Sequence, residues 1–193
     1  MDKNSFTAYD SLKTIEAAIN DTKNSKTGAS FYYVLWGLIL FIYYSTLCGI
    51  IIKPELKGTF IDTFSWVVFP VGGLLSYLNK NKDQREETYV PHLEKVYFFA
   101  FTGFACMYAV LTFASTYLSS PLAIILFPLM IGSTVYVVGG ISKHKISIVC
   151  GVISMCLSVV SILSVIEIQF LMAALACISA CIIPGITMRK SNV

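Results

Sequence analysis

Few side chains in this sequence are suited to acid–base catalysis or metal binding. The two histidines, His92 and His144, lie in charged segments, and Lys143 and Lys145 flank the second one. Positive neighbours disfavour a metal ion, and neither histidine has a carboxylate or cysteine partner at ligand spacing. The sequence also has no HExxH pair, no GxSxG motif and no glycine-rich phosphate loop. These features predict a protein that is not an enzyme and that holds no metal or cofactor.

All six cysteines fall in long apolar runs, away from both histidines. None belongs to a CxxC pair, so they are expected to pack as small, polarisable side chains rather than to form disulfides or bind metal. Two of them, one helical turn apart, should share one face of a helix. The six are Cys48, Cys106, Cys150, Cys156, Cys177 and Cys181.

Four tyrosines lie deep in the apolar runs, where a phenol needs a hydrogen-bond partner. They are Tyr43, Tyr44, Tyr108 and Tyr136. Serine and threonine hydroxyls in the same runs offer such partners. One interpretation is hydrogen bonding between helices, and the other is a pocket for an amphipathic small molecule.

Long uncharged runs separate the few charged segments. Of 193 residues, 56% are apolar and 13% are charged, and the mean hydropathy is +0.73. A soluble domain carries about a quarter charged residues, whereas about 20 apolar residues form a helix that crosses a bilayer. Six runs meet or approach this length: residues 31–52, 60–78, 96–118, 121–141, 146–166 and 168–188. We therefore expect an all-α fold, a six-helix transmembrane bundle over residues 29–188 in a lipid bilayer, with no nucleic-acid partner.

Basic residues are held on the cytoplasmic side of a membrane, and their distribution orients the six predicted spans. With a cytoplasmic N-terminus, the external loops contain only Lys53 and Lys57. The other basic residues are then cytoplasmic: Lys3, Lys13, Lys23, Lys26, Lys80, Lys82, Arg85, Lys95, Lys143, Lys145, Arg189 and Lys190. The sequence thus predicts a multi-pass membrane protein with both termini, including the tail 189–193, in the cytoplasm.

Two cytoplasmic segments hold most of the polar residues. Before the first span, apolar residues recur every three or four positions, which predicts a short N-terminal amphipathic helix. They are Phe6, Tyr9, Leu12, Ile15 and Ile19. The polar run 21–28 is expected to end this helix and form a hinge, so that residues 1–28 are one unit. The helix could lie on the bilayer surface, pack under the bundle or pair with another chain. The second segment, residues 79–95, is interpreted as a solvated loop or as part of a docking surface.

A proline recurs in each predicted returning helix, at Phe69-Pro70, Phe127-Pro128 and Ile183-Pro184. The spacing indicates three tandem hairpins, and kinks are expected at Pro70 and Pro128. Small residues also form a stripe on each of the last two spans. Such stripes let helices approach closely, so these two helices are expected to pack through them, unless a stripe faces a partner subunit. The stripes are Ser147, Gly151, Ser154, Ser158 and Ser161, and Ala173, Cys177 and Cys181.

The run GASFYYVLWGLILFIYYS, after the amphipathic helix, and the C-terminal IIPGITMRK give the chain a family resemblance. It resembles a group of uncharacterised six-span integral membrane proteins of Bacteroidota. The resemblance covers nearly the whole chain and implies the same architecture in a bacterial inner membrane. It implies no activity for any residue.

These observations favour a non-enzymatic membrane protein with an interaction or regulatory role. The N-terminal helix and residues 79–95 would face a cytoplasmic protein partner, and a homo-oligomer stays open. The alternative is a small carrier or receptor for a lipophilic or weakly polar molecule, which would use the tyrosine-lined interior.

Overall fold

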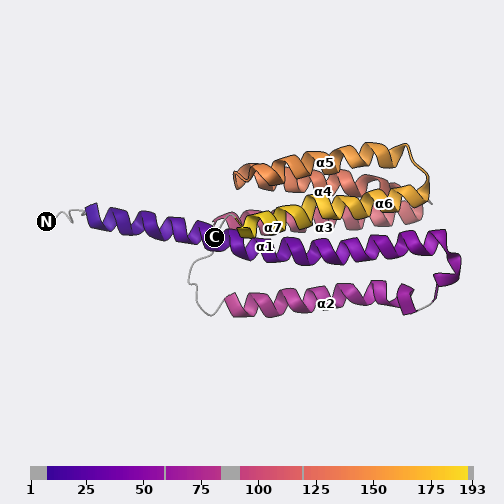
Figure 1. Ribbon diagram of the computed structural model, residues 1–193, viewed down its shortest axis with the longest axis horizontal. Helices are drawn as coiled ribbons and strands as arrows, with labels where there is room; N and C mark the ends of the chain where they lie inside the picture. Colours follow the sequence, from indigo (N-terminus) through magenta and orange to yellow (C-terminus); the bar gives the residue numbers. More distant parts are fainter. Residues whose placement is uncertain (1–7, 59, 84–91, 119, 191–193) are drawn as a thin grey trace.

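The chain is helical throughout the part that the structure describes. The computed structural model describes residues 8–58, 60–83, 92–118 and 120–190. In chain order the elements are α1 (Ala8–Ile52), the 3₁₀ turn η1 (Pro54–Leu56), α2 (Phe60–Asp83), α3 (His92–Tyr117), α4 (Leu122–Ile141), α5 (Lys145–Ile162), α6 (Ile166–Cys177), the π-helical turn η2 (Ile178–Ile182) and α7 (Ile183–Lys190). They lie side by side in one bundle (Figure 1), which confirms the predicted all-α fold.

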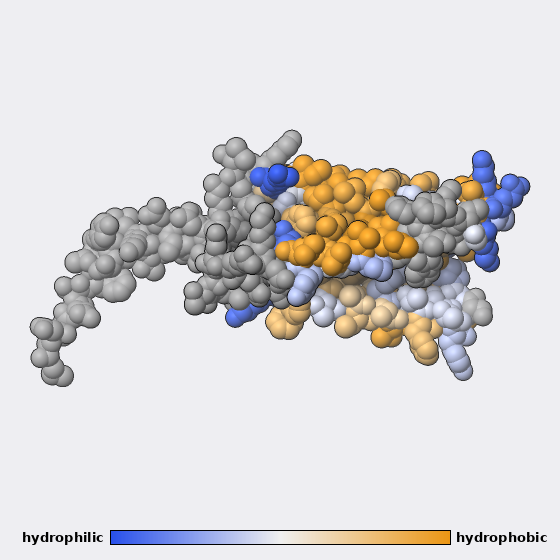
Figure 2. All heavy atoms as spheres, turned by 90° about the horizontal axis from the view of Figure 1, so that it is seen from below, coloured by the Kyte–Doolittle hydropathy of each residue, from blue (hydrophilic) through white to orange (hydrophobic). Residues whose placement is uncertain are grey.

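Five helical segments are long and apolar enough to cross a membrane. On the face seen in Figure 2, hydrophobic side chains form a band between hydrophilic ends. Large apolar side chains of α3 are open to the surroundings; Phe99, for example, is 69% exposed and Val110 is 68% exposed. Such a surface matches hydrocarbon, so the protein is a multi-pass membrane protein. The five segments are Ser30–Ile52, Lys95–Tyr117, Leu122–Ile141, Lys145–Ile162 and Ile166–Arg189.

The remaining predicted span, residues 60–78, corresponds to α2, which packs on α1 at the edge of the bundle (Figure 1). Its 24 residues give a length of about 36 Å at 1.5 Å per residue, enough to cross a hydrocarbon layer of about 30 Å. The apolar stretch within its described side chains, Val67–Asn79, is shorter than a full span. A sixth crossing therefore stays a prediction.

The first helix differs from the expected short helix and hinge. Helix α1 runs unbroken from Ala8 to Ile52, through the whole polar run 21–28. The physical reason is that the run contains no proline, and its lysines are good helix formers, while Gly28 costs only about 1 kcal/mol in a helix interior. Residues 8–29, which we call the arm, extend beyond the bundle (Figure 1).

Consecutive helices are neighbours, as the three predicted hairpins require: α1 packs on α2, α3 on α4, and α5 on α6. The closest approach, however, joins two hairpins through α4 and α5. A Cβ atom added to Gly132 would lie 2.7 Å from the carbonyl oxygen of Gly151, and one added to Gly139 would lie 2.8 Å from Ser147 Cβ.

The serine stripe of α5 therefore faces α4, not α6 as expected. Ser154 Oγ donates to the carbonyl oxygen of Pro128 at 3.0 Å, and Ser158 Oγ donates to that of Ile125 at 3.1 Å. Both acceptors are backbone carbonyl oxygens within α4, and such an oxygen keeps a second lone pair beyond the one used inside its own helix. The α4 helix is the one that offers both the glycines and these acceptors.

The small residues of the last span pack against α1. Cys181 Cβ lies 2.7 Å from where a Cβ of Gly37 would stand, and Ser30 Oγ donates to the carbonyl oxygen of Gly185 at 2.6 Å. Both α2 and α4 stay helical through Pro70 and Pro128. The kinks at these two prolines stay a prediction, and in the last span the chain widens into the π-turn η2 just before Pro184. All six cysteines are free thiols, as predicted.

Candidate functional site

Three of the four predicted tyrosines meet in a pocket at the end of the bundle opposite the arm. Tyr43 and Tyr44 come from α1 and Tyr108 from α3. The pocket has a volume of about 450 Å³. We call it the tyrosine pocket, and its lining is Tyr43, Tyr44, Leu47, Tyr108, Thr112, Ser115, Thr116, Ser120, Pro121, Ala123, Ile124, Ile166 and Phe170.

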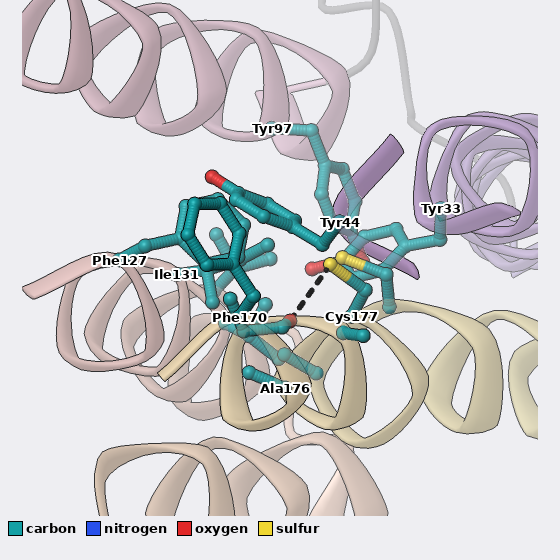
Figure 3. Packing of buried hydrophobic residues seen from close by; sticks show 14 of the residues in the cluster. Tyr33, Tyr44, Tyr97, Phe127, Ile131, Phe170, Ala176 and Cys177 are labelled. Carbon is teal, nitrogen blue, oxygen red and sulfur yellow. Dashed lines mark hydrogen bonds between the residues drawn. The ribbon is translucent and has the colours of Figure 1, made fainter. Parts of the chain in front are cut away.

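The centre of the site is a hydrogen bond between two phenols from different helices. Tyr44 Oη and Tyr108 Oη are 2.7 Å apart. Tyr44 is 1% exposed and its ring lies 4.6 Å from that of Phe127 and 6.5 Å from that of Phe170. Figure 3 shows Tyr44 between these neighbours on α4 and α6. The apolar surroundings hold the Tyr44 phenol against Tyr108.

Helix geometry explains why two adjacent tyrosines play different parts. Successive side chains on a helix point about 100° apart, so Tyr44 faces the core while Tyr43 turns toward α2. The Tyr43 ring lies 5.0 Å from the Phe69 ring of α2 and 5.3 Å from the Tyr44 ring. Tyr43 thus forms the wall between the tyrosine pocket and α2.

The hydroxyl groups of Thr112, Ser115 and Thr116 also line the pocket, and each donates its proton to a backbone carbonyl oxygen. Thr112 Oγ1 donates to the carbonyl oxygen of Tyr108 at 2.8 Å, and Thr116 Oγ1 donates to that of Thr112 at 3.0 Å. Ser115 Oγ donates to the carbonyl oxygen of Ser120 and accepts from the Ala123 N–H. These groups keep free lone pairs but offer a ligand no spare proton.

Tyr136 lies outside the tyrosine pocket. It sits 12 residues beyond Ile124 on the same helix, which is about 18 Å along the axis, and it is 45% exposed. Its backbone instead packs on α5, because a Cβ added to Gly151 would lie 2.8 Å from Tyr136 N. The prediction groups Tyr136 with the other three tyrosines because all four lie away from the ends of their predicted spans. That position does not tell which half of the bundle a residue occupies.

Several pocket residues have no sequence signal that marks them. Phe170 and Ile166 of α6 and the Ser120-Pro121 turn enter the pocket only because α6 and α4 begin at the same end of the bundle. Polar residues stand out in apolar runs, as the tyrosines do, whereas Phe170 and Ile166 look like the other apolar residues of a span.

The lining of the tyrosine pocket contains no Asp, Glu, His, Lys, Arg or Cys side chain. Across the described residues, no group of three His, Cys, Asp or Glu side chains is placed to hold a metal ion.

No protein-family model matches the chain, and comparisons with curated proteins and with solved structures find no match either. The proposal for the function therefore depends on the geometry of the pocket and of α1.

Proposed function

We propose that the protein is a non-enzymatic membrane receptor with a regulatory role. It binds an uncharged amphipathic molecule in the tyrosine pocket and presents the arm to a cytoplasmic protein. One observation carries this proposal: a single helix supplies both parts. Helix α1 lines the pocket with Tyr43, Tyr44 and Leu47 and continues without a break into residues 8–29.

A continuous helix transmits a movement of one end to the other. The Tyr44–Tyr108 hydrogen bond connects α1 to α3 at the pocket, so a ligand that inserts beside it favours one placement of α1 over another. A ligand shifts such an equilibrium only by its difference in affinity for the two placements. The arm, about 33 Å long at 1.5 Å per residue, amplifies a small tilt of α1 into a larger displacement at its end.

The orientation of the arm follows from charge. The basic residues favour cytoplasmic termini, which puts the arm and residues 79–95 on the side of a cytoplasmic partner. Of the second segment, residues 84–91 lie outside the described part of the chain. The resemblance to six-span proteins of Bacteroidota favours a bacterial inner membrane.

A receptor fits the packing better than a carrier does. Beyond the pocket, α4 is filled by side chains with almost no exposure: Phe127 0%, Ile131 1% and Val135 0%. Protein interiors packed in this way leave no path for a molecule. The ligand therefore enters and leaves by the same end.

Cross-linking in cells tests whether the arm binds a cytoplasmic protein. Changing Leu12, Ile15 and Ile19 to Gln removes the apolar face predicted from the sequence while keeping good helix formers. We expect this variant, and a deletion of residues 2–20, to lose the same cross-linked cytoplasmic protein. Changing Lys13 and Glu16 to Gln is the matched control and should retain it. An unchanged set of partners in all four proteins would contradict the proposal.

The pocket is tested by blocking it. Thr116 lines the pocket and donates its proton to the carbonyl oxygen one turn earlier; Thr46 makes the same local bond but lies outside the pocket. We expect Thr116→Trp to remove a small molecule retained by the purified protein, seen by native mass spectrometry, and Thr46→Trp to keep it. Equal retention by both variants would place the ligand elsewhere.

A further inference from the structure

The tyrosine pocket limits its ligand to an uncharged molecule. Its lining consists of Tyr, Thr, Ser, Phe, Leu, Ile, Ala and Pro side chains. An ion that entered would lose its hydration and gain no opposite charge in return. A neutral, lipid-soluble molecule avoids this cost and can reach the pocket from the bilayer.

The two hydrogen-bonded phenols leave one proton for a ligand. Tyr44 is 1% exposed, so its hydroxyl must donate to Tyr108 Oη, 2.7 Å away, or remain an unpaired buried donor. Tyr108 Oη then accepts from Tyr44 and has its own proton to give. A phenol that accepts a hydrogen bond in an apolar site becomes a stronger donor.

Thr112 is the competing acceptor for this proton. Its hydroxyl lines the same pocket and donates to the backbone carbonyl oxygen of Tyr108, so toward the Tyr108 phenol it can offer only a lone pair. A ligand must therefore present a better acceptor than a threonine hydroxyl, and a carbonyl oxygen meets this requirement.

The walls of the pocket favour a flat ring. Tyr43, Tyr44, Tyr108 and Phe170 all line it, and aromatic side chains pack on planar rings by stacking and edge contacts. The volume of about 450 Å³ lies within the range of about 300–1,000 Å³ usual for small-molecule sites.

We propose that the tyrosine pocket binds the ring of a lipid-soluble quinone, with one quinone carbonyl oxygen accepting a hydrogen bond from Tyr108 Oη. The inference rests on the proposed receptor function, because it names the ligand class of the same pocket. It concerns binding alone and involves no electron transfer.

Two probes of the same shape separate the carbonyl from the ring. Duroquinone and durene share a ring with four methyl groups, but only duroquinone has carbonyl oxygens. Calorimetric titration of the protein in lipid nanodiscs, with empty nanodiscs as the blank for partitioning, gives the Kd of each. We expect duroquinone to bind about fivefold more tightly than durene, the effect of one neutral hydrogen bond of about 1 kcal/mol.

Variants then assign the donor. Tyr108→Phe should weaken duroquinone about fivefold and leave durene unchanged, so durene reports any structural damage. Thr112→Val removes the competing acceptor and should tighten the binding of duroquinone relative to that of durene.

Three results would overturn the inference. Equal affinity for the two probes would show that no hydrogen bond to the quinone carbonyl contributes to binding. Equal weakening of both probes by Tyr108→Phe would show that Tyr108 has only a structural role. Tighter binding of an aliphatic ester than of duroquinone would rule out the ring. If Thr116→Trp still abolished ligand retention, the receptor proposal would hold even though the quinone inference had failed. If Thr116→Trp had no effect, both proposals would be wrong.

Discussion

Three glycines set the distance between α4 and α5. At Gly132, Gly139 and Gly151 an added Cβ would come within 3.0 Å of atoms on the facing helix, including backbone atoms that cannot move aside. In a membrane, where lipid tails are as apolar as side chains, close backbone packing and hydrogen bonds between helices are the main attraction. These glycines therefore hold together the helix pair that connects two hairpins.

We expect Gly151→Ala to destabilise the protein by about 1–3 kcal/mol, the usual cost of overpacking. Gly140→Ala on α4 is the matched control, because nothing lies within 4 Å of its added Cβ. It should leave stability unchanged or raise it by up to about 1 kcal/mol, since alanine favours a helix over glycine. Unfolding in detergent, followed by circular dichroism, measures both. Equal effects of the two changes would argue against the close α4–α5 contact.

At the scale of elements, α1 does more than its sequence indicates. It contributes Tyr33 and Tyr44 to the buried core, lines the pocket and forms the arm. The contact between α1 and the last span depends on Gly37 and Gly185, where a side chain would meet Cys181 or Val34. The membrane part of α1 thus packs against the last span as well as against α2, while the arm lies outside the bundle.

Continuity of the arm predicts a narrow distance distribution between spin labels. Labels at residues 11 and 29, in a cysteine-free background, should be separated by about 27 Å at 1.5 Å per residue. Labels at residues 31 and 49 span the same number of residues inside the bundle and serve as the control. A distribution for the first pair that is much broader or shorter than that of the control would restore the hinge at residues 21–28.

For the whole molecule, the position of α2 decides the number of crossings. The arm and α7 lie at one end of the bundle, and the turn containing η1 lies at the other (Figure 1). Six crossings would keep both termini on one side of the membrane, whereas five would put them on opposite sides.

Reporter fusions measure this arrangement directly. Phosphatase and fluorescent-protein reporters at either end, after Lys57 and within residues 84–91 should show both ends and residues 84–91 in the cytoplasm, with Lys57 outside. The physical reason is retention of basic segments on the cytoplasmic side. Termini on opposite sides would mean that α2 does not cross.

The sequence by itself determined the helical class and the positions of the five apolar helices, whereas of the six cysteines only Cys150, Cys177 and Cys181 are buried in the packing. These properties depend on local composition, because a bilayer requires about 20 consecutive apolar residues and satisfied backbone hydrogen bonds. The tyrosines were also visible as phenols in apolar runs. Three of the four, Tyr43, Tyr44 and Tyr108, form the pocket.

Only the tertiary structure decided which helix each stripe faces, and that Tyr136 lies about 18 Å from the pocket-lining part of α4. The serine stripe of α5 has suitable spacing for any neighbour, and α4 receives it because the glycines of α4 allow a close approach and two of its carbonyl oxygens accept hydrogen bonds from the serines. The hydrophobic pattern did not predict that α1 is continuous. A polar run shows where a helix leaves the membrane, but it does not by itself end the helix. Which surfaces meet depends on pairs of residues distant in the chain, and a periodicity read along one helix contains no information about its partner.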